Sequence, residues 1–217
     1  MIIIMSGMMG TGKSTYTAWL AQQYGFIPQF ETVIGNPYLE KFYAEPQRYA
    51  KALQDFFLND RINALQKALQ QEHTILDRSL LDNEIFNRVY HQMGYMTDDE
   101  FADCQHALSE AKHTWLSHHS DDTLLIYLQG DFETVLQRIT GRAHAYEQCT
   151  ENSHHLTYYR QLYQAYQTWF DDYDFSPKIA IDIQRFDVVK RPEEVVQYIK
   201  ETLMQTSKGE TTWLQQL

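Results

Sequence analysis

The stretch Met1-Ile-Ile-Ile-Met-Ser-Gly7-Met-Met-Gly-Thr-Gly-Lys13-Ser14 decides the fold of this chain. Its apolar start, Ile2–Met5, predicts a β-strand, and the segment from Lys13 to Tyr24, closed by Gly25, predicts a helix. Residues 7–14 match G-x-x-x-x-G-K-[ST], a loop that binds phosphate groups when a strand precedes it and a helix follows. Since spacing and context agree, the sequence predicts a nucleotide-phosphate site, with an incidental glycine turn as the alternative.

The residue types in this loop suit the chemistry of phosphate. Glycines let the backbone curl so that its amides point at phosphate oxygens, and the following helix adds its positive N-terminal end. Lys13 is predicted to bridge the β- and γ-phosphates of ATP, and Ser14 to offer a hydroxyl to Mg²⁺. The predicted cofactor-binding residues of the loop are Gly7, Met8, Met9, Gly10, Thr11, Gly12, Lys13, Ser14 and Thr15.

Length and composition restrict the classes of protein to consider. The 217 residues suffice for one α/β domain spanning 1–217, and 43% hydrophobic with 22% charged residues is typical of a globular protein. The 18 basic and 29 acidic residues give a net charge of −11, which argues against a nucleic-acid polymer as partner. No apolar run could span a membrane, no signal-peptide pattern opens the chain, and Cys104 and Cys149 lack metal or redox spacing. We therefore expect a cytoplasmic protein.

Short apolar runs alternate with helical patterns along the rest of the chain, which is typical of a parallel βαβ sheet. Pro28 has no backbone N–H, so its strand is expected at a sheet edge. Further helices are expected over 46–71, from the Thr97–Glu100 capping box to about Ser117, and from Pro192 onward, with a loose polar tail after residue 207. The predicted fold is a five-stranded parallel sheet flanked by helices, with strands at Ile2–Met5, Phe26–Phe30, Thr74–Leu76, Thr123–Leu128 and Lys178–Ile181.

An acid at the end of the third predicted strand is a candidate metal-site residue. Asp77 stands at the carboxyl end of that strand beside the phosphate loop, where it would organise the water shell of Mg²⁺. A helix N-cap is the alternative interpretation of Asp77.

A phosphate loop alone does not separate a kinase from a GTPase or a motor. No N-K-x-D tetrapeptide occurs and Asp77 is not part of a D-x-x-G motif, which argues against a signalling GTPase.

Seven motifs follow one another along the chain. They are the phosphate loop; Phe30-Glu31 with Asn36-Pro37 and Phe42-Tyr43; Leu53-Gln54 through Arg61; Asp77-Arg78-Ser79; Arg138-Ile139 with Arg142 and Tyr146-Glu147-Gln148; Tyr158-Tyr159-Arg160-Gln161-Leu162; and Tyr173-Asp174-Phe175-Ser176-Pro177-Lys178. Each motif except the loop is weak alone. Together, nearly end to end, they resemble the deoxynucleoside kinase family, most closely its bacterial deoxyadenosine/deoxyguanosine kinase branch. The resemblance implies a P-loop kinase fold of the α/β class with a helical lid at about residues 138–148.

The resemblance implies a catalytic group at Glu31. A 5′-hydroxyl is a poor nucleophile near pH 7, so a carboxylate within hydrogen-bond reach should accept its proton as the bond to phosphorus forms. Glu31 matches the base of the family, and Arg78 would hold the 5′-oxygen and Glu31 in line. On composition alone, Glu31 could equally be a solvated acid at a strand end, and Arg78 part of a structural salt bridge.

The resemblance also implies residues that bind the substrate. Tyr43 and Glu147 match the pair that grips the 3′-hydroxyl of the sugar. Gln54 can present a donor and an acceptor to the base. Arg61 lies two helical turns further on and would share that face of the helix, unless its side chain reaches out to solvent.

The chain departs from the family pattern at two points. At the first of them, the family has an acid that binds the nucleoside base. Here the position is Asn83, with Asp82 just before it, and we predict that Asn83 also binds the substrate. In the lid, Arg138 and Arg142 are four residues apart and resemble the arginines that close over the phosphates. The next lid arginine of the family is His144 here, so we expect lid closure to be weaker or sensitive to pH.

The sequence therefore predicts a kinase that uses ATP and Mg²⁺ to phosphorylate the 5′-hydroxyl of a deoxynucleoside, with deoxyadenosine or deoxyguanosine favoured. The resemblance also implies a homodimer. Two alternatives stay open. A nucleoside monophosphate kinase of thymidylate-kinase type shares the loop and lid but must hold an acceptor phosphate, which Glu31 would repel. A non-catalytic nucleotide-binding subunit on the same fold would accommodate Asn83 and His144, and would show no phosphorylation rate.

Overall fold

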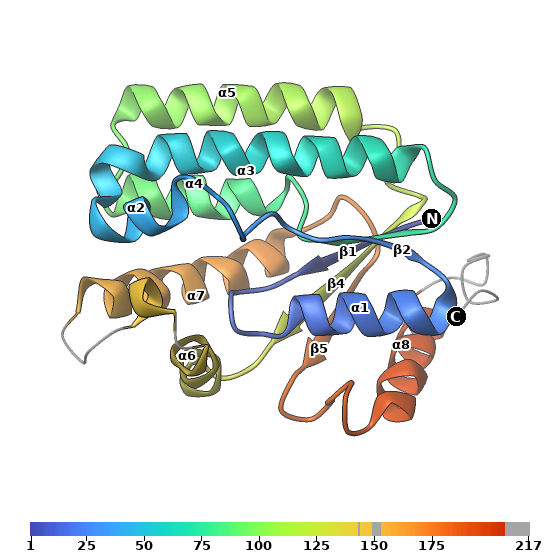
Figure 1. The fold of residues 1–217 in the computed structure, drawn as a ribbon. Helices are drawn as coiled ribbons and strands as arrows, with labels where there is room; N and C mark the ends of the chain where they lie inside the picture. Colours follow the sequence, from blue (N-terminus) through green and yellow to red (C-terminus); the bar gives the residue numbers. More distant parts are fainter. Residues whose placement is uncertain (143, 149–152, 207–217) are drawn as a thin grey trace.

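The computed structural model describes residues 1–142, 144–148 and 153–206. Within this part of the chain, five strands form one parallel sheet in the order β2-β3-β1-β4-β5 (Figure 1). The predicted five-stranded parallel sheet is thus confirmed, and the strand that contains Pro28 lies at an edge as expected. The predicted loose tail after 207 lies outside the described residues. The strands are β1 (Ile2–Ser6), β2 (Ile27–Gln29), β3 (Thr74–Asp77), β4 (Thr123–Gln129) and β5 (Lys178–Asp182).

Helices cover both faces of this sheet (Figure 1). In that view α3, α4 and α5 lie above the sheet, while α1 and α8 lie below it. The shorter elements α2, α6 and η1, and the start of α7, gather at the end toward which the strands point. The helices are α1 (Lys13–Tyr24), α2 (Leu39–Ala44), α3 (Pro46–Leu69), α4 (Asp82–Gln92), α5 (Asp98–Trp115), α6 (Phe132–Gly141), the 3-10 turn η1 (Ala145–Glu147), α7 (His154–Asp172) and α8 (Pro192–Thr206).

Local signals set the helix ends that the sequence predicted. Gly25 ends α1 in the left-handed conformation, with φ of 71°. Thr97 accepts from the backbone N–H of Glu100, whose side chain accepts from the backbone of Thr97 in return, so the capping box that starts α5 is present. The sequence did not predict α4, whose N-cap Leu81 makes no side-chain capping bond. It also did not predict α7, which Ser153 caps by accepting from the N–H of Leu156.

The strand pairing brings two functional segments together. β1 is buried between β3 and β4, and Met5 lies opposite Asp77 in the parallel register. The phosphate loop that follows β1 and the segment that follows β3 therefore leave the sheet side by side. The backbone N–H of Arg78 still donates to Met5 O at 3.0 Å, which extends the pairing by one residue. None of the helices in the described part of the chain combines the length and apolarity needed to cross a bilayer.

The phosphate loop packs directly against α6. Gly10 has φ of 86°, and a Cβ there would lie 2.8 Å from Val135 O and 2.9 Å from Ile139 Cγ1. Neither contact leaves room for a side chain, and the first is to rigid backbone. The loop is therefore held at this point by close approach as well as by its left-handed conformation.

We expect Gly10→Ala to lower the melting temperature by about 4 °C or more beyond the effect of Gly35→Ala. Gly35 is the matched control because its φ is 80° and its Cβ would meet no atom within 4 Å. Both variants carry the left-handed strain of about 1–2 kcal/mol, and only Gly10→Ala adds a clash. Thermal unfolding followed by circular dichroism measures the difference, and equal melting temperatures would contradict the close packing of the loop.

Candidate active site

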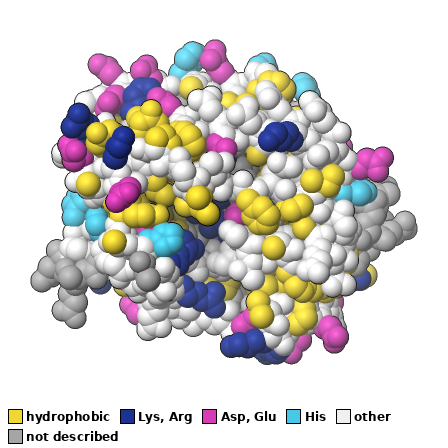
Figure 2. All heavy atoms as spheres, viewed as in Figure 1, with side chains coloured by type: hydrophobic (Ala, Val, Ile, Leu, Met, Phe, Trp, Pro, Cys, Tyr) yellow, Lys and Arg dark blue, Asp and Glu magenta, His cyan; other side chains and the backbone are white. Residues whose placement is uncertain are grey.

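A cavity of about 370 Å³ opens where β1 and β3 end. The phosphate loop, the segment after β2, α3, α4 and the lid contribute its walls. Figure 2 shows a hollow near the centre of the face turned to the viewer, bordered by hydrophobic side chains with Lys and Arg side chains beneath it. Of the predicted site residues, the cavity brings together Met9, Lys13, Ser14, Glu31, Tyr43, Arg61, Asp77, Arg78, Arg142 and Glu147.

Lys13 lies folded onto its own loop. Its Nζ donates to Gly7 O at 2.9 Å and to Met8 O at 3.1 Å. Burial, together with the nearby charge of Arg78, lowers the pKa of Lys13 to about 7. The ammonium group is therefore held in place by carbonyl oxygens and would gain strongly from a phosphate charge beside it.

Ser14 and Asp77 face one another across the junction of loop and sheet. Ser14 Oγ donates to Asp77 Oδ2 at 2.5 Å. Asp77 is the last residue of β3, and α4 begins only at Asp82, so the interpretation of Asp77 as a helix N-cap is wrong. Burial raises the pKa of Asp77. A hydroxyl and a carboxylate at this spacing are the hard oxygen donors that Mg²⁺ prefers, so the two residues fit a magnesium site.

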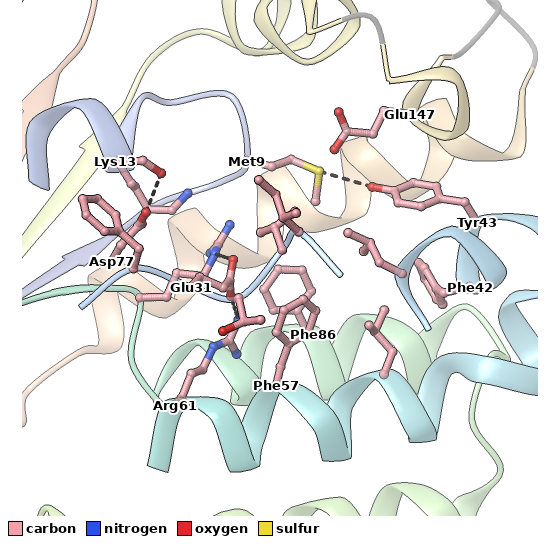
Figure 3. A pocket seen from close by; sticks show the side chains of 18 of the residues that line it. Met9, Lys13, Glu31, Phe42, Tyr43, Phe57, Arg61, Asp77, Phe86 and Glu147 are labelled. Carbon is pink, nitrogen blue, oxygen red and sulfur yellow. Dashed lines mark hydrogen bonds and ion pairs between the residues drawn. The ribbon is translucent and has the colours of Figure 1, made fainter. Parts of the chain in front are cut away.

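Glu31 lines the cavity and lies beside Arg61 (Figure 3). Arg61 Nη2 donates to Glu31 Oε1 at 2.5 Å, and Arg78 Nε donates to Glu31 Oε2 at 3.1 Å. The Glu31 side chain is only 12% exposed, so it is not a solvated acid at a strand end. Burial alone would raise the pKa of Glu31, but the charges of Arg61 and Arg78 hold it below its ordinary value. Glu31 is therefore a largely buried carboxylate anion.

Arg61 does not reach solvent. Its side chain is 3% exposed, and its guanidinium lies 5.1 Å from the centre of the Phe57 ring and 5.8 Å from that of Phe86. Its Nη1 donates to Asn83 Oδ1 at 2.7 Å. Arg61 therefore links Glu31, at one end of the cavity, to Asn83 on α4.

Gln54 and Asn83 lie behind the cavity wall and are not among the residues that line it. Asn83 Nδ2 is 3.2 Å from Gln54 Oε1 and 3.4 Å from Gln54 O. Both residues are about 98% buried. Gln54 shares its helix face with Phe57 and Arg61, which do line the cavity. The two predicted base-binding residues thus lie together behind the cavity wall and bond to one another.

Tyr43 and Glu147 lie at the other end of the cavity (Figure 3). Tyr43 Oη donates to Met9 Sδ at 3.6 Å, which connects α2 to the phosphate loop. Glu147 is 6% exposed, and its Oε2 has no hydrogen-bond partner among the described residues. Burial raises the pKa of Glu147, while Arg142 at 3.9 Å opposes that shift. Arg142 and His144 each lie 3.9 Å from this carboxylate, so among the described residues neither side chain reaches hydrogen-bond distance of it.

The two arginines of the predicted lid line different cavities. α6 ends at Gly141, so Arg142 is its C-cap, and Arg142 lines the main cavity. Arg138 instead lines a separate cavity of about 220 Å³ beside Gly12. His144 Nδ1 lies 2.8 Å from the Tyr146 hydroxyl, on the lid itself. The predicted lid of residues 138–148 includes residue 143, which lies outside the described residues.

Two buried side chains around Arg78 were not predicted as site residues. Asp82 Oδ1 accepts from Arg78 Nη1 at 3.1 Å, and the Tyr166 hydroxyl bonds to both groups. The sequence signal for Asp82 was its position four residues after Arg78 and directly before Asn83. Tyr166 carried no signal beyond a place on the apolar face of an aromatic-rich helix.

Comparison with known proteins agrees with this geometry. A family model described as deoxynucleoside kinase matches residues 3–205. The chain is 32% identical to a deoxyguanosine kinase of Lactobacillus acidophilus over 98% of this chain and 95% of that protein. It is 30% identical to a deoxyadenosine kinase of the same organism over 92% and 94% of the two chains. A structure of deoxyadenosine kinase from M. mycoides with dCMP and dCDP bound matches with a TM-score of 0.77 and 26% identity, covering 93% of this chain and all of that one.

The family model matches most of the chain, and the relatives are about 30% identical over nearly its whole length. Fold and motifs therefore point to the same family. The α/β P-loop kinase fold, predicted from the sequence, is confirmed by the same comparisons, and the lid stays a prediction. The chain belongs to the deoxynucleoside kinase family, the enzymes that phosphorylate deoxynucleosides.

Proposed function

We propose that this enzyme transfers the γ-phosphate of ATP to the 5′-hydroxyl of a purine deoxynucleoside, with Glu31 as the general base. The observation that carries the proposal is the buried Glu31 carboxylate, which lines the same cavity as Lys13 and Ser14. A carboxylate in that position suits an alcohol acceptor, because it can take the proton of the hydroxyl as the bond to phosphorus forms. Arg78, bonded to Glu31, would hold the 5′-oxygen in line.

The phosphate groups of ATP would lie along the loop of residues 7–15. Lys13 would exchange the carbonyl oxygens of Gly7 and Met8 for oxygens of the β- and γ-phosphates. Ser14 would bind Mg²⁺, and Asp77 would orient its water shell; the ion would supply charge neutralisation between the phosphates. Arg142 would add a positive charge from the lid.

The sugar would lie between Tyr43 and Glu147. Among the described residues, Glu147 Oε2 is a buried acceptor without a hydrogen-bond donor, and such a group is unfavourable until a donor reaches it. A 3′-hydroxyl supplies that donor, with the Tyr43 hydroxyl beside it in the cavity. This supports a nucleoside whose 3′-hydroxyl is free.

The bonds of Asn83 set which end of the Gln54 amide faces Tyr90, a residue that lines the cavity. The Arg61 guanidinium only donates, so the Asn83 atom facing it must be the carbonyl Oδ1. Asn83 Nδ2 then faces Gln54 and uses the side-chain carbonyl of that residue. The Gln54 amide nitrogen is left to donate; it bonds the Tyr90 hydroxyl, and Tyr90 lines the cavity.

The Tyr90 hydroxyl accepts from Gln54 and so keeps its own proton to donate into the cavity, which favours a base edge that accepts. Guanine presents two acceptors, N7 and O6, where adenine presents one acceptor and the N6 amino donor. We therefore propose that deoxyguanosine is preferred over deoxyadenosine. The Lactobacillus relatives named deoxyguanosine kinase and deoxyadenosine kinase support a purine substrate, and the nucleotides bound to the M. mycoides enzyme support nucleotide ligands.

A coupled assay of the four natural deoxynucleosides and their monophosphates, with ATP and Mg²⁺, separates this proposal from its alternatives. Turnover of deoxynucleosides supports it, and turnover of monophosphates alone would indicate a thymidylate-kinase type of reaction. That alternative is disfavoured because Glu31 would repel an acceptor phosphate. The single domain over 1–217, the homodimer and the cytoplasmic location stay predictions from the sequence.

We expect Glu31→Gln to lower kcat by about 10²–10⁴-fold, the usual contribution of general base catalysis. ATP binding, measured by calorimetry, should stay within about threefold of the wild type because Glu31 lies at the acceptor end. Glu40→Gln, an exposed acid on α2, is the control for loss of a carboxylate and should keep wild-type kcat. Near-normal turnover of Glu31→Gln would remove the general base from the proposal.

We expect Asn83→Asp to shift base preference toward deoxyadenosine. A carboxylate only accepts, so Gln54 would turn its amide nitrogen to residue 83 and its carbonyl to Tyr90, whose hydroxyl would then donate to Gln54 and accept from the base. The ratio of kcat/KM for deoxyguanosine over deoxyadenosine should fall by about tenfold or more. Asn59→Asp, on the exposed face of α3, controls for the added charge. An unchanged ratio in Asn83→Asp would show that this amide does not set base preference.

A further inference from the structure

Arg78 has a backbone conformation that needs support. Among the described residues it is the one non-glycine residue with positive φ, at 74°, and it is buried directly after β3. The left-handed conformation costs a non-glycine residue about 1–2 kcal/mol. Such conformations persist only where the surroundings over-determine them. The neighbours of the Arg78 side chain must therefore hold it.

Three acceptors surround one nitrogen of the Arg78 guanidinium. Nη1 lies 3.1 Å from Gly7 O and 3.1 Å from Asp82 Oδ1, and it also bonds the Tyr166 hydroxyl. Nε donates to Glu31. In the part of the chain that the structure describes, no group bonds to Nη2. The protein thus uses two nitrogens to fix the guanidinium and leaves the third as a donor for a substrate oxygen.

Asp82 anchors this arrangement from the first turn of α4. Its side chain is fully buried, and its Oδ1 accepts from Ser6 Oγ at 2.9 Å and from Tyr166 Oη at 2.9 Å as well as from Arg78. Its Oδ2 accepts from the backbone N–H of Ser79 at 3.1 Å. Burial alone would raise the pKa of Asp82, but the charge of Arg78 holds it below its ordinary value. Asp82 is therefore an anion whose donors come from β1, α7 and the segment after β3.

Tyr166 completes the arrangement from α7. The residue is fully buried, and its hydroxyl accepts from Arg78 while it donates to Asp82. Its ring packs edge to face with Phe86 at 6.1 Å and lies 5.8 Å from the Arg78 guanidinium. One hydroxyl thereby fixes the separation between the arginine and its counter-ion.

We propose that Asp82 and Tyr166 are positioning residues that lock the Arg78 guanidinium against Glu31 and keep its free nitrogen available to the reacting oxygens. The inference rests on the proposed function, in which Arg78 and Glu31 act on the 5′-hydroxyl. Neither Asp82 nor Tyr166 lines the cavity, so both act through Arg78. Preorganised donors of this kind cost no reorganisation when charge develops in the transition state.

The first test removes the Tyr166 hydroxyl. Tyr166→Phe should lower kcat by about tenfold, part of the loss seen when one preorganised donor is removed outright. KM for ATP and for the deoxynucleoside should stay within about twofold, because the binding groups are untouched. Tyr163→Phe is the matched control, since Tyr163 lies on the same helix and its hydroxyl donates to Gly130 O, away from Arg78. It should keep the wild-type kcat.

The second test uses charge. Glu31 faces Arg61 from α3, Arg78 after β3 and Lys13 from α1, and Asp82 faces the same three cations. Asp82→Asn removes the anion that balances them, so the cations act more strongly on Glu31 and its pKa falls. The acid limb of the pH profile of kcat/KM should therefore move to lower pH in Asp82→Asn. It should stay in place in Tyr166→Phe, which removes no charge.

Rates are expressed per native molecule, with the native fraction taken from circular dichroism at the assay temperature. A wild-type kcat in Tyr166→Phe, or an unmoved acid limb in Asp82→Asn, would overturn the positioning role. A loss in Tyr163→Phe equal to that in Tyr166→Phe would also overturn it, since a general effect of α7 packing would then suffice. Failure of the wild type to phosphorylate any deoxynucleoside would instead contradict the proposed function, on which the positioning role depends.

Discussion

A carboxylate buried between two guanidinium groups is the interaction on which the rest of the site depends. Glu31 bonds Arg61 and Arg78, which lie 30 and 47 residues further along the chain. Removing one partner of a buried ion pair typically costs about 3–5 kcal/mol, because a charge is left without compensation. The segment after β2, the helix α3 and the segment after β3 are therefore held together at one point. That point is also where the proposed reaction needs an ionised base.

The order of the strands explains why this cluster faces the phosphate loop. β1 and β3 are neighbours, so Gly7 and Arg78 leave the sheet at the same edge, and Arg78 Nη1 donates to Gly7 O at 3.1 Å. One side chain thus contacts the loop proposed for the phosphate donor and the base proposed for the acceptor. Holding two reactants in such a fixed geometry is a large part of the catalysis of phosphoryl transfer. The sheet supplies that geometry through backbone pairing.

Local sequence patterns predicted much of the fold and part of the site. The spacing of the phosphate loop predicted β1 and α1, and Thr97 predicted the start of α5, because these signals act over a few residues. The contacts of Arg78 were out of reach, since Tyr166 lies 88 residues away and meets it only when α7 packs on α4. Helical spacing placed Gln54 on the face of Arg61, but it could not show that Asn83 would take its carbonyl. Partners chosen by tertiary packing leave no periodic trace in the sequence.

A crystal structure with deoxyguanosine and a non-hydrolysable ATP analogue tests the central claim most directly. The account predicts a Glu31 carboxylate oxygen within about 2.6–3.2 Å of the 5′-oxygen of the nucleoside, the distance that proton transfer requires. It also predicts Lys13 beside the β- and γ-phosphates. A 5′-oxygen out of reach of Glu31, with that carboxylate still paired only to Arg61 and Arg78, would contradict the account.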